Sequence, residues 1–100
     1  MVWQNLRDSI KYSPGGITSK VIHKSEKSNV TLFLMAAGTD ISEHTATREG
    51  LIYVIEGQGI FVLDGKKIKM QPGVLISMRK NSPHSLEAEE NTAFLLSLSG

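Results

Sequence analysis

The chain has 100 residues and a mass of 11.0 kDa, with 11 lysine and arginine residues against 10 aspartate and glutamate residues. This length allows one compact domain, and a net charge of +1 provides no basic field for binding nucleic acid or an anionic membrane surface. The chain has no cysteine, which excludes disulfides, thiolate metal sites and a cysteine nucleophile. Any chemistry must therefore come from the 3 histidines, the carboxylates or the hydroxyls.

Residues 1–16 differ from the rest of the chain in their apolar spacing. Trp3, Leu6 and Ile10 lie at intervals of three and four, which fits a helix but also an irregular strand. A proline and two glycines follow and indicate a turn, since proline fixes φ and glycine permits positive φ. We therefore predict an N-terminal arm over residues 1–16, followed by a single domain over residues 17–100.

No segment suggests export or insertion into a membrane. The N-terminal residues lack the apolar stretch of a signal peptide, and no run approaches the roughly 20 apolar residues that span a bilayer. We expect a cytoplasmic protein.

Beyond the turn, the apolar spacing changes to two, which is typical of strands. The predicted strands are residues 17–24, 29–36, 51–56, 60–63, 66–70, 74–78 and 93–98. Asp64 and Gly65 separate two of them and favour a type I′ turn, because both central residues of that turn need positive φ. Turn signals about every eight to twelve residues, without a long amphipathic helix, predict an all-β antiparallel sandwich or barrel.

The second predicted strand is apolar on both faces. Val30, Leu32 and Leu34 alternate with Phe33 and Met35. One face can fill the interior of a barrel while the other packs against a partner subunit, which would supplement the limited interior of so small a domain. We therefore predict a homodimer.

Two motifs carry a resemblance to a known family. Residues 38–57, GTDISEHTATREGLIYVIEG, resemble the first motif of the cupin superfamily, and residues 73–88, GVLISMRKNSPHSLEA, resemble the second. The spacing between the opening glycine and the histidine of each motif matches the family pattern. The chain is therefore similar to short single-domain cupins with degenerate metal-binding motifs, and the cupin barrel would occupy residues 17–100.

The resemblance implies a cupin-type jelly-roll β-barrel (double-stranded β-helix) with one small-molecule cavity, usually in a dimer. It also implies a divalent metal, such as Fe, Mn, Ni or Zn, held by three histidines and a glutamate. In this sequence, His44 and His84 stand at the first and third histidine positions, whereas Ala46 stands at the second and Gly50 at the glutamate. Two of the four usual ligands are missing, so a metal site and a site without metal both stay open.

Two further residues are candidate metal ligands. Glu49 lies one residue from the glutamate position and could reach the site if residues 47–50 form a bulge. Two histidines and one carboxylate form the ligand set of non-haem Fe(II) oxygenases. His23 shares a face with Val21 in a regular strand, so it could point inward as a ligand or as a hydrogen-bonded core residue. Both assignments depend on strand register.

The leading functional hypothesis is a cupin that binds a small polar molecule, with His44 and His84 lining the cavity. Arg48 and Arg79 are candidate ligand-binding residues for an anionic group. The alternative is a metal-dependent cupin enzyme, an oxygenase, isomerase or lyase, that acts on a small polar metabolite. Acid–base catalysis by histidine without a metal also stays open. A serine nucleophile is disfavoured, because no G-x-S-x-G motif occurs.

Overall fold

The computed structural model describes residues 3–100, which form a short 3-10 helix and nine β-strands. The helix, η1, spans Leu6–Ser9. The strands are β1 (Ile17–Lys24), β2 (Ser28–Met35), β3 (Asp40–His44), β4 (Glu49–Glu56), β5 (Gly59–Leu63), β6 (Lys66–Met70), β7 (Leu75–Met78), β8 (His84–Ala88) and β9 (Thr92–Ser99). No helix within residues 3–100 is long and apolar enough to cross a membrane.

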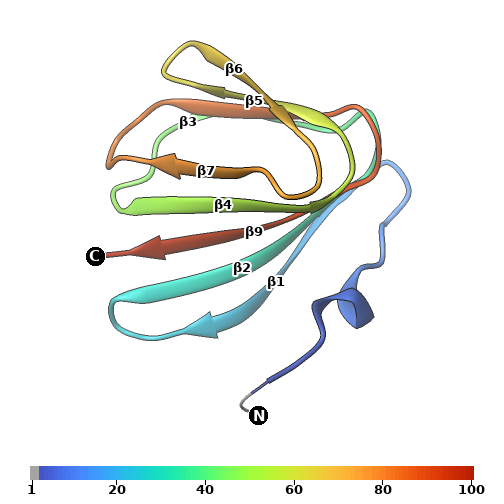
Figure 1. The fold of residues 1–100 in the computed structure, drawn as a ribbon, viewed down its shortest axis with the longest axis horizontal. Coiled ribbons are helices and arrows are strands. Elements are labelled where there is room, and N and C mark those ends of the chain that lie inside the picture. The colour runs from blue at the N-terminus through green and yellow to red at the C-terminus, as the bar shows by residue number, and fades with distance from the viewer. Residues whose placement is uncertain (1–2) are drawn as a thin grey trace.

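The strands form two antiparallel sheets that face each other (Figure 1). One sheet has five strands in the order β1-β2-β9-β4-β7, and the other has four in the order β3-β8-β5-β6. Strands that are distant in the chain are therefore neighbours, which confirms the predicted all-β jelly-roll barrel. Within residues 3–100, hydrogen bonds do not join the two sheets into a closed cylinder. The space between the sheets is filled by side chains.

Seven of the strands lie where the sequence predicts them, with ends that agree within two residues. Asp64 and Gly65 have φ angles of 50° and 80°, which confirms the type I′ turn between β5 and β6. The sequence analysis did not predict β3 and β8. Only one of the five residues of β3 is apolar, and β8 begins directly after a proline, so neither segment carries a clear strand pattern.

Strict alternation along the strands places the main core between the sheets. In β4, Gly50, Ile52 and Val54 are buried, whereas Leu51 and Tyr53 point outward and are exposed. The buried residues of the core come from both sheets and are Met35, Ile52, Val54, Phe61, Met70, Ile76, Met78, Leu86, Ala88 and Phe94.

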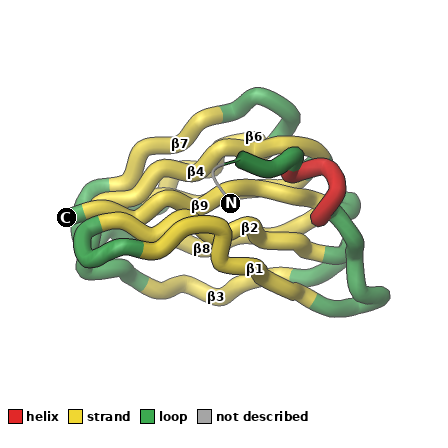
Figure 2. The backbone as a smooth tube through the Cα atoms, turned by 90° about the horizontal axis from the view of Figure 1, so that it is seen from below, coloured by secondary structure: helices red, strands yellow, loops and turns green. Residues whose placement is uncertain are grey.

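The N-terminal segment lies against the outer face of the five-stranded sheet (Figure 2). Its Ile10 and Tyr12 pack on Leu32 and Leu34 of β2, which form a second apolar cluster with Ala93. The chain itself therefore covers the outer face of β2 that the sequence analysis assigned to a partner subunit.

Residues 6–9 form one turn of 3-10 helix rather than a longer helix or a strand. The side-chain oxygen of Asn5 accepts a hydrogen bond from the backbone N–H of Arg7 at 3.0 Å, which caps the start of the turn. Ile10 already has extended backbone angles. Leu6 and Ile10 therefore do not lie on one helix, because the chain becomes extended at Ile10. The side chain of Ile10 packs on the sheet.

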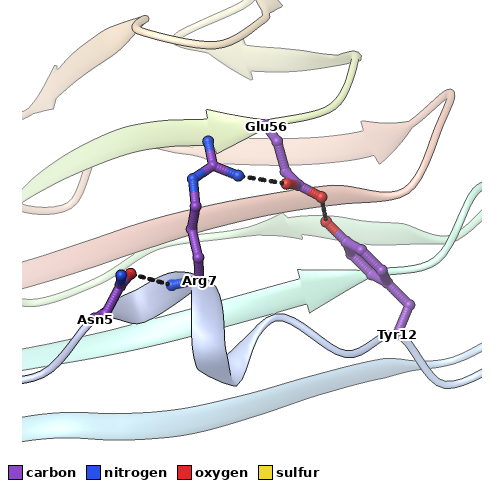
Figure 3. A network of polar contacts seen from close by, with 4 residues as sticks. All are labelled: Asn5, Arg7, Tyr12 and Glu56. Atoms are coloured by element: carbon purple, nitrogen blue, oxygen red, sulfur yellow. Dashed lines mark hydrogen bonds and ion pairs between the residues drawn. The ribbon is translucent and has the colours of Figure 1, made fainter.

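A polar network fixes this segment to the end of β4 (Figure 3). The hydroxyl of Tyr12 donates a hydrogen bond to Oε2 of Glu56 at 2.7 Å, and Nη1 of Arg7 donates to Oε1 at 3.3 Å. Glu56 reaches this outer face because a register shift after Val54 places it opposite Ala93 of β9. Burial raises the pKa of Tyr12 above its ordinary value, and the hydrogen bond to Glu56 and its negative charge raise it further.

Candidate functional site

His44 and His84 meet on the inner face of the four-stranded sheet. They are direct cross-strand partners of β3 and β8, and their ring centroids lie 4.1 Å apart at an interplanar angle of 60°. The register shifts between Ile41 and His44, so two residues of β3 stand opposite one residue of β8. In a regular strand, Ile41 and His44 would point to opposite faces because they are three residues apart. The bulge therefore turns His44 inward.

The orientation of each imidazole ring is fixed by a backbone carbonyl. Nδ1 of His44 lies 2.8 Å from the carbonyl oxygen of Ser42, and Nδ1 of His84 lies 2.9 Å from that of Ser82. A carbonyl oxygen only accepts, so Nδ1 must be the protonated nitrogen of each ring. In the neutral form, Nε2 of each ring then carries a free lone pair. The histidine pair therefore presents two adjacent hydrogen-bond acceptors, the Nε2 atoms.

The two histidines differ in exposure. His84 is buried, with 5% of its surface exposed, and its ring stacks on that of Phe61 at 5.8 Å. His44 is exposed. Within residues 3–100, every fully buried side-chain nitrogen or oxygen has a hydrogen-bond partner, and no described residue bonds Nε2 of His84. This atom must therefore lie in the small part of the residue that a ligand or solvent can reach.

A cavity of about 120 Å³ opens beside the two rings. Its other walls are apolar side chains from both sheets: Phe33, Ile41, Ile52, Leu86, Phe94 and Leu96. Phe33 and Phe94 stack with a centroid distance of 5.1 Å and an interplanar angle of 4°. Two imidazoles are therefore the polar groups of an otherwise apolar pocket, which is the usual composition of a small-molecule site.

The residues present do not fit the four-ligand metal site that the resemblance implies. Gly50 lies on the inner face opposite Met78, and a Cβ built on it would lie 2.8 Å from Cε of Met78. The methionine thus fills the space of the family's glutamate. Within residues 3–100, no three His, Cys, Asp or Glu side chains lie close enough together to hold a metal ion.

The structure places Glu49 and His23 away from the cavity. Glu49 is the exposed cross-strand partner of Ser99, and no bulge carries it to the inner face. A register shift between Val21 and His23 places His23 opposite Val30, on the outer face, where it is exposed. In a regular strand, His23 would lie on the same face as Val21 and could point inward, as the sequence analysis considered.

Arg48 and Arg79 also lie outside the cavity wall. Nη2 of Arg48 donates a hydrogen bond to the backbone oxygen of Glu26 at 2.8 Å. Arg79 is exposed and lines a separate depression together with Glu49 at the ends of β4 and β7. The structure therefore joins His44 and His84 and separates them from both arginines.

Sequence reasoning missed several groups that shape the site. The backbone carbonyls of Ser42 and Ser82 set the ring orientations, and a sequence carries no signal for a carbonyl direction. The ring of Phe61 stacks on that of His84. The sequence predicts the strand that carries Phe61, but not that this strand lies beside β8, which depends on the order of strands in the sheet. The serine side chains at these positions give no signal either, because any residue two positions before a histidine carries the same backbone carbonyl.

The fold agrees with the comparison to known families. A family model described as a cupin domain matches residues 31–98, and the chain therefore belongs to the cupin family. No curated protein matches the chain.

Many solved structures share this fold. A conserved protein of unknown function from Streptococcus pyogenes is 20% identical, aligns over 97% of this chain and 85% of its own, and has a TM-score of 0.88. A cupin 2 conserved barrel domain protein from Leptotrichia buccalis is 31% identical, with a TM-score of 0.90, and aligns over 97% of this chain but 47% of its own. Salicylate 1,2-dioxygenase from Pseudoaminobacter salicylatoxidans is 19% identical over 94% of this chain and 28% of its own, with a TM-score of 0.78.

Proposed function

We propose that this cupin binds a small molecule in the cavity beside His44 and His84. The observation that carries the proposal is the convergence of two oriented imidazoles on an otherwise apolar cavity of about 120 Å³. The bulge in β3 brings this second polar ring to the inner face. Bulges of this kind commonly redirect a side chain at a functional site.

A fragment screen by two-dimensional ¹H–¹⁵N NMR tests this proposal. We expect a subset of fragments to shift the amide signals of residues 41–44 and 84–86 in the wild-type protein. The same fragments should lose most of their effect on His84→Ala and His44→Ala. The matched control is His23→Ala, which removes an exposed histidine outside the cavity and should bind as the wild type does. Absence of any hit at these residues, or hits that ignore both substitutions, would contradict the proposal.

A metal-dependent enzyme is the second candidate. One observation favours it: a ring that donates Nδ1–H to a carbonyl and presents Nε2 has the orientation of metal-ligating histidines. The fold likeness to a dioxygenase is consistent with it. Against it stand the glycine and the alanine at two ligand positions. Glu49 and His23 remain predicted ligands only if the strands that carry them rearrange.

Elemental analysis separates the two candidates. The protein would be incubated with Fe(II), Mn(II), Ni(II) or Zn(II), desalted and measured for bound metal. The enzyme candidate requires one metal ion per chain that is lost in His84→Ala, whereas the binding candidate expects no such retention. Arg48 and Arg79 remain predicted binding residues for an anionic group of a ligand that extends beyond the cavity. The cytoplasmic location also remains a prediction from the sequence.

We also infer that a second copy of the chain covers the outer face of β4 and β7. Leu51, Tyr53 and Leu75 are 46%, 45% and 62% exposed there, and Tyr53 is the cross-strand partner of Leu75. The N-terminal segment covers only the neighbouring part of this face. An apolar patch of this kind suits contact with its own copy across a twofold axis.

A further inference from the structure

The cavity beside the histidine pair limits the size of its ligand. Its volume is about 120 Å³, and an apolar protein cavity of about 150 Å³ is known to bind benzene. The space is therefore comparable to that of one six-membered ring and smaller than two fused rings would fill. The parallel rings of Phe33 and Phe94 add a flat wall, which favours a planar guest.

The polar end of the cavity limits the chemistry of the ligand. Both Nδ1–H groups are already donated to backbone carbonyls, so the neutral rings offer two Nε2 acceptors and no free donor. The side chains of the remaining wall residues are apolar and offer neither a hydrogen-bond donor nor an acceptor. Burying an acceptor without a partner is unfavourable, so a ligand that supplies an O–H or N–H group is bound better than one without it.

The same argument disfavours an anionic head group. As long as both imidazoles are neutral, a carboxylate, which only accepts hydrogen bonds, would face two lone pairs among apolar side chains without a compensating donor. Arg48 and Arg79, which could neutralise such a charge, do not line the cavity.

From this match of size and hydrogen bonding, we infer that the site takes uncharged single-ring compounds that carry one hydrogen-bond donor, with phenol as the simplest member. The hydroxyl donates to Nε2 of His84 or His44, and the ring packs against Phe33, Phe94 and the aliphatic wall. This inference rests on the proposed small-molecule function and assigns the ligand class to the same site.

Four probes test the ligand class at pH 8, measured by NMR titration of the wild-type protein. Phenol is the match, anisole lacks the O–H group, benzoate carries a negative charge, and 1-naphthol has a second ring. We expect saturable shifts at residues 41–44 and 84–86 with phenol. Anisole should bind about three- to tenfold more weakly, which corresponds to the loss of one net hydrogen bond. Benzoate and 1-naphthol should not saturate.

Two variants locate the binding. Leu96→Phe enlarges a wall residue of the cavity and leaves both histidines in the sequence, so phenol affinity should fall at least about tenfold while the imidazole signals persist. His23→Ala is the control and should leave phenol binding unchanged. Circular dichroism of each variant verifies the fold. His44→Phe is a second test at an exposed position, and it should also weaken phenol binding because it removes one of the two Nε2 acceptors.

Each outcome of these titrations and of the fragment screen supports or contradicts the inference. Equal binding of phenol and anisole, or binding of benzoate or 1-naphthol at least as tight as that of phenol, would overturn the ligand class. Phenol binding that survives Leu96→Phe would move the site elsewhere and overturn the inference too. If the fragment screen yields cavity hits but phenol does not bind, the ligand class fails while the proposed function stands. If no fragment reaches the cavity, both fail.

Discussion

Gly50 shows how one residue can exclude a ligand set. It stands where the resemblance places a glutamate, and the side chain of Met78 has taken the space in front of it. A Cβ at this position would lie 2.8 Å from Cε of Met78 and 3.3 Å from Cδ2 of Leu98. The pairing of a glycine with a long flexible side chain keeps this part of the core packed and apolar.

We therefore expect Gly50→Glu to lower the free energy of unfolding by about 2–4 kcal/mol, because its carboxylate would be buried among apolar side chains. Gly50→Ala should cost less than about 1.5 kcal/mol, since the end of Met78 can move aside and alanine suits a strand better than glycine. Urea denaturation followed by circular dichroism measures both. Equal losses in the two variants would show that steric crowding, not charge burial, dominates at this position.

Tyr12 makes the stability sensitive to alkaline pH. Its pKa is raised in the folded protein by burial and by Glu56, so the folded state holds the phenolic proton more tightly than the unfolded state does. This stabilisation is fully present below the unfolded pKa of about 10 and is lost as the pH rises above it.

We expect the stability of the wild type, relative to Tyr12→Phe, to fall as the pH rises above about 10, since the variant lacks the titrating group. At pH 7, Tyr12→Phe should cost about 1–2 kcal/mol through the lost hydrogen bond to Glu56. Urea denaturation of both proteins across this pH range gives the difference. A difference that stays constant with pH would contradict the linkage.

At the scale of elements, two strand irregularities decide which histidines share a site. The shift in β3 turns His44 inward beside His84, and the shift in β1 turns His23 outward. Both shifts break the period of two on which strand patterns are read. The candidate site is thus defined by two exceptions to the rule that otherwise predicts the strands well.

The N-terminal segment is the second element with an energetic role. Ile10 packs on the outer apolar cluster around Leu32, so Ile10→Ser should lower the free energy of unfolding by about 1.5–3 kcal/mol. Arg7→Ala removes the ion pair to Glu56, whose partners are 68% and 35% exposed, and should cost under about 1 kcal/mol. Thermal and urea unfolding provide the comparison. A larger effect of Arg7→Ala would mean that charge, rather than apolar contact, holds the segment.

At the scale of the whole molecule, the two sheets leave unequal outer faces. The four-stranded sheet carries Lys67 and Glu87 outward, whereas the five-stranded sheet leaves Leu51, Tyr53 and Leu75 exposed. The N-terminal segment covers only part of the latter sheet (Figure 2). The proposed dimer would therefore form through the five-stranded sheet.

Light scattering after size exclusion should therefore give twice the 11.0 kDa monomer mass. The double variant Leu51→Lys with Leu75→Lys should elute as a monomer, because the introduced charges would be buried in the dimer. Lys67→Glu on the other sheet is the control and should remain dimeric. A wild-type mass near 11.0 kDa would overturn the proposed dimer.

The sequence by itself determined the fold class, seven of the nine strands and the two histidines most worth following. These follow from local information: the period of apolar residues, the Asp64-Gly65 turn and the spacing of two motifs. The resemblance to the cupin motifs placed Ala46 and Gly50 at two ligand positions.

Only the tertiary structure decided how those two histidines are arranged relative to each other and to the cavity. The 4.1 Å approach of their rings, the carbonyls that orient them and the apolar walls around them all depend on strand register and on which strands become neighbours. A shift of one residue reverses the face on which a side chain lies, and pairing across sheets joins segments far apart in the chain. Neither property is encoded in a local pattern, because both result from the packing of the complete barrel.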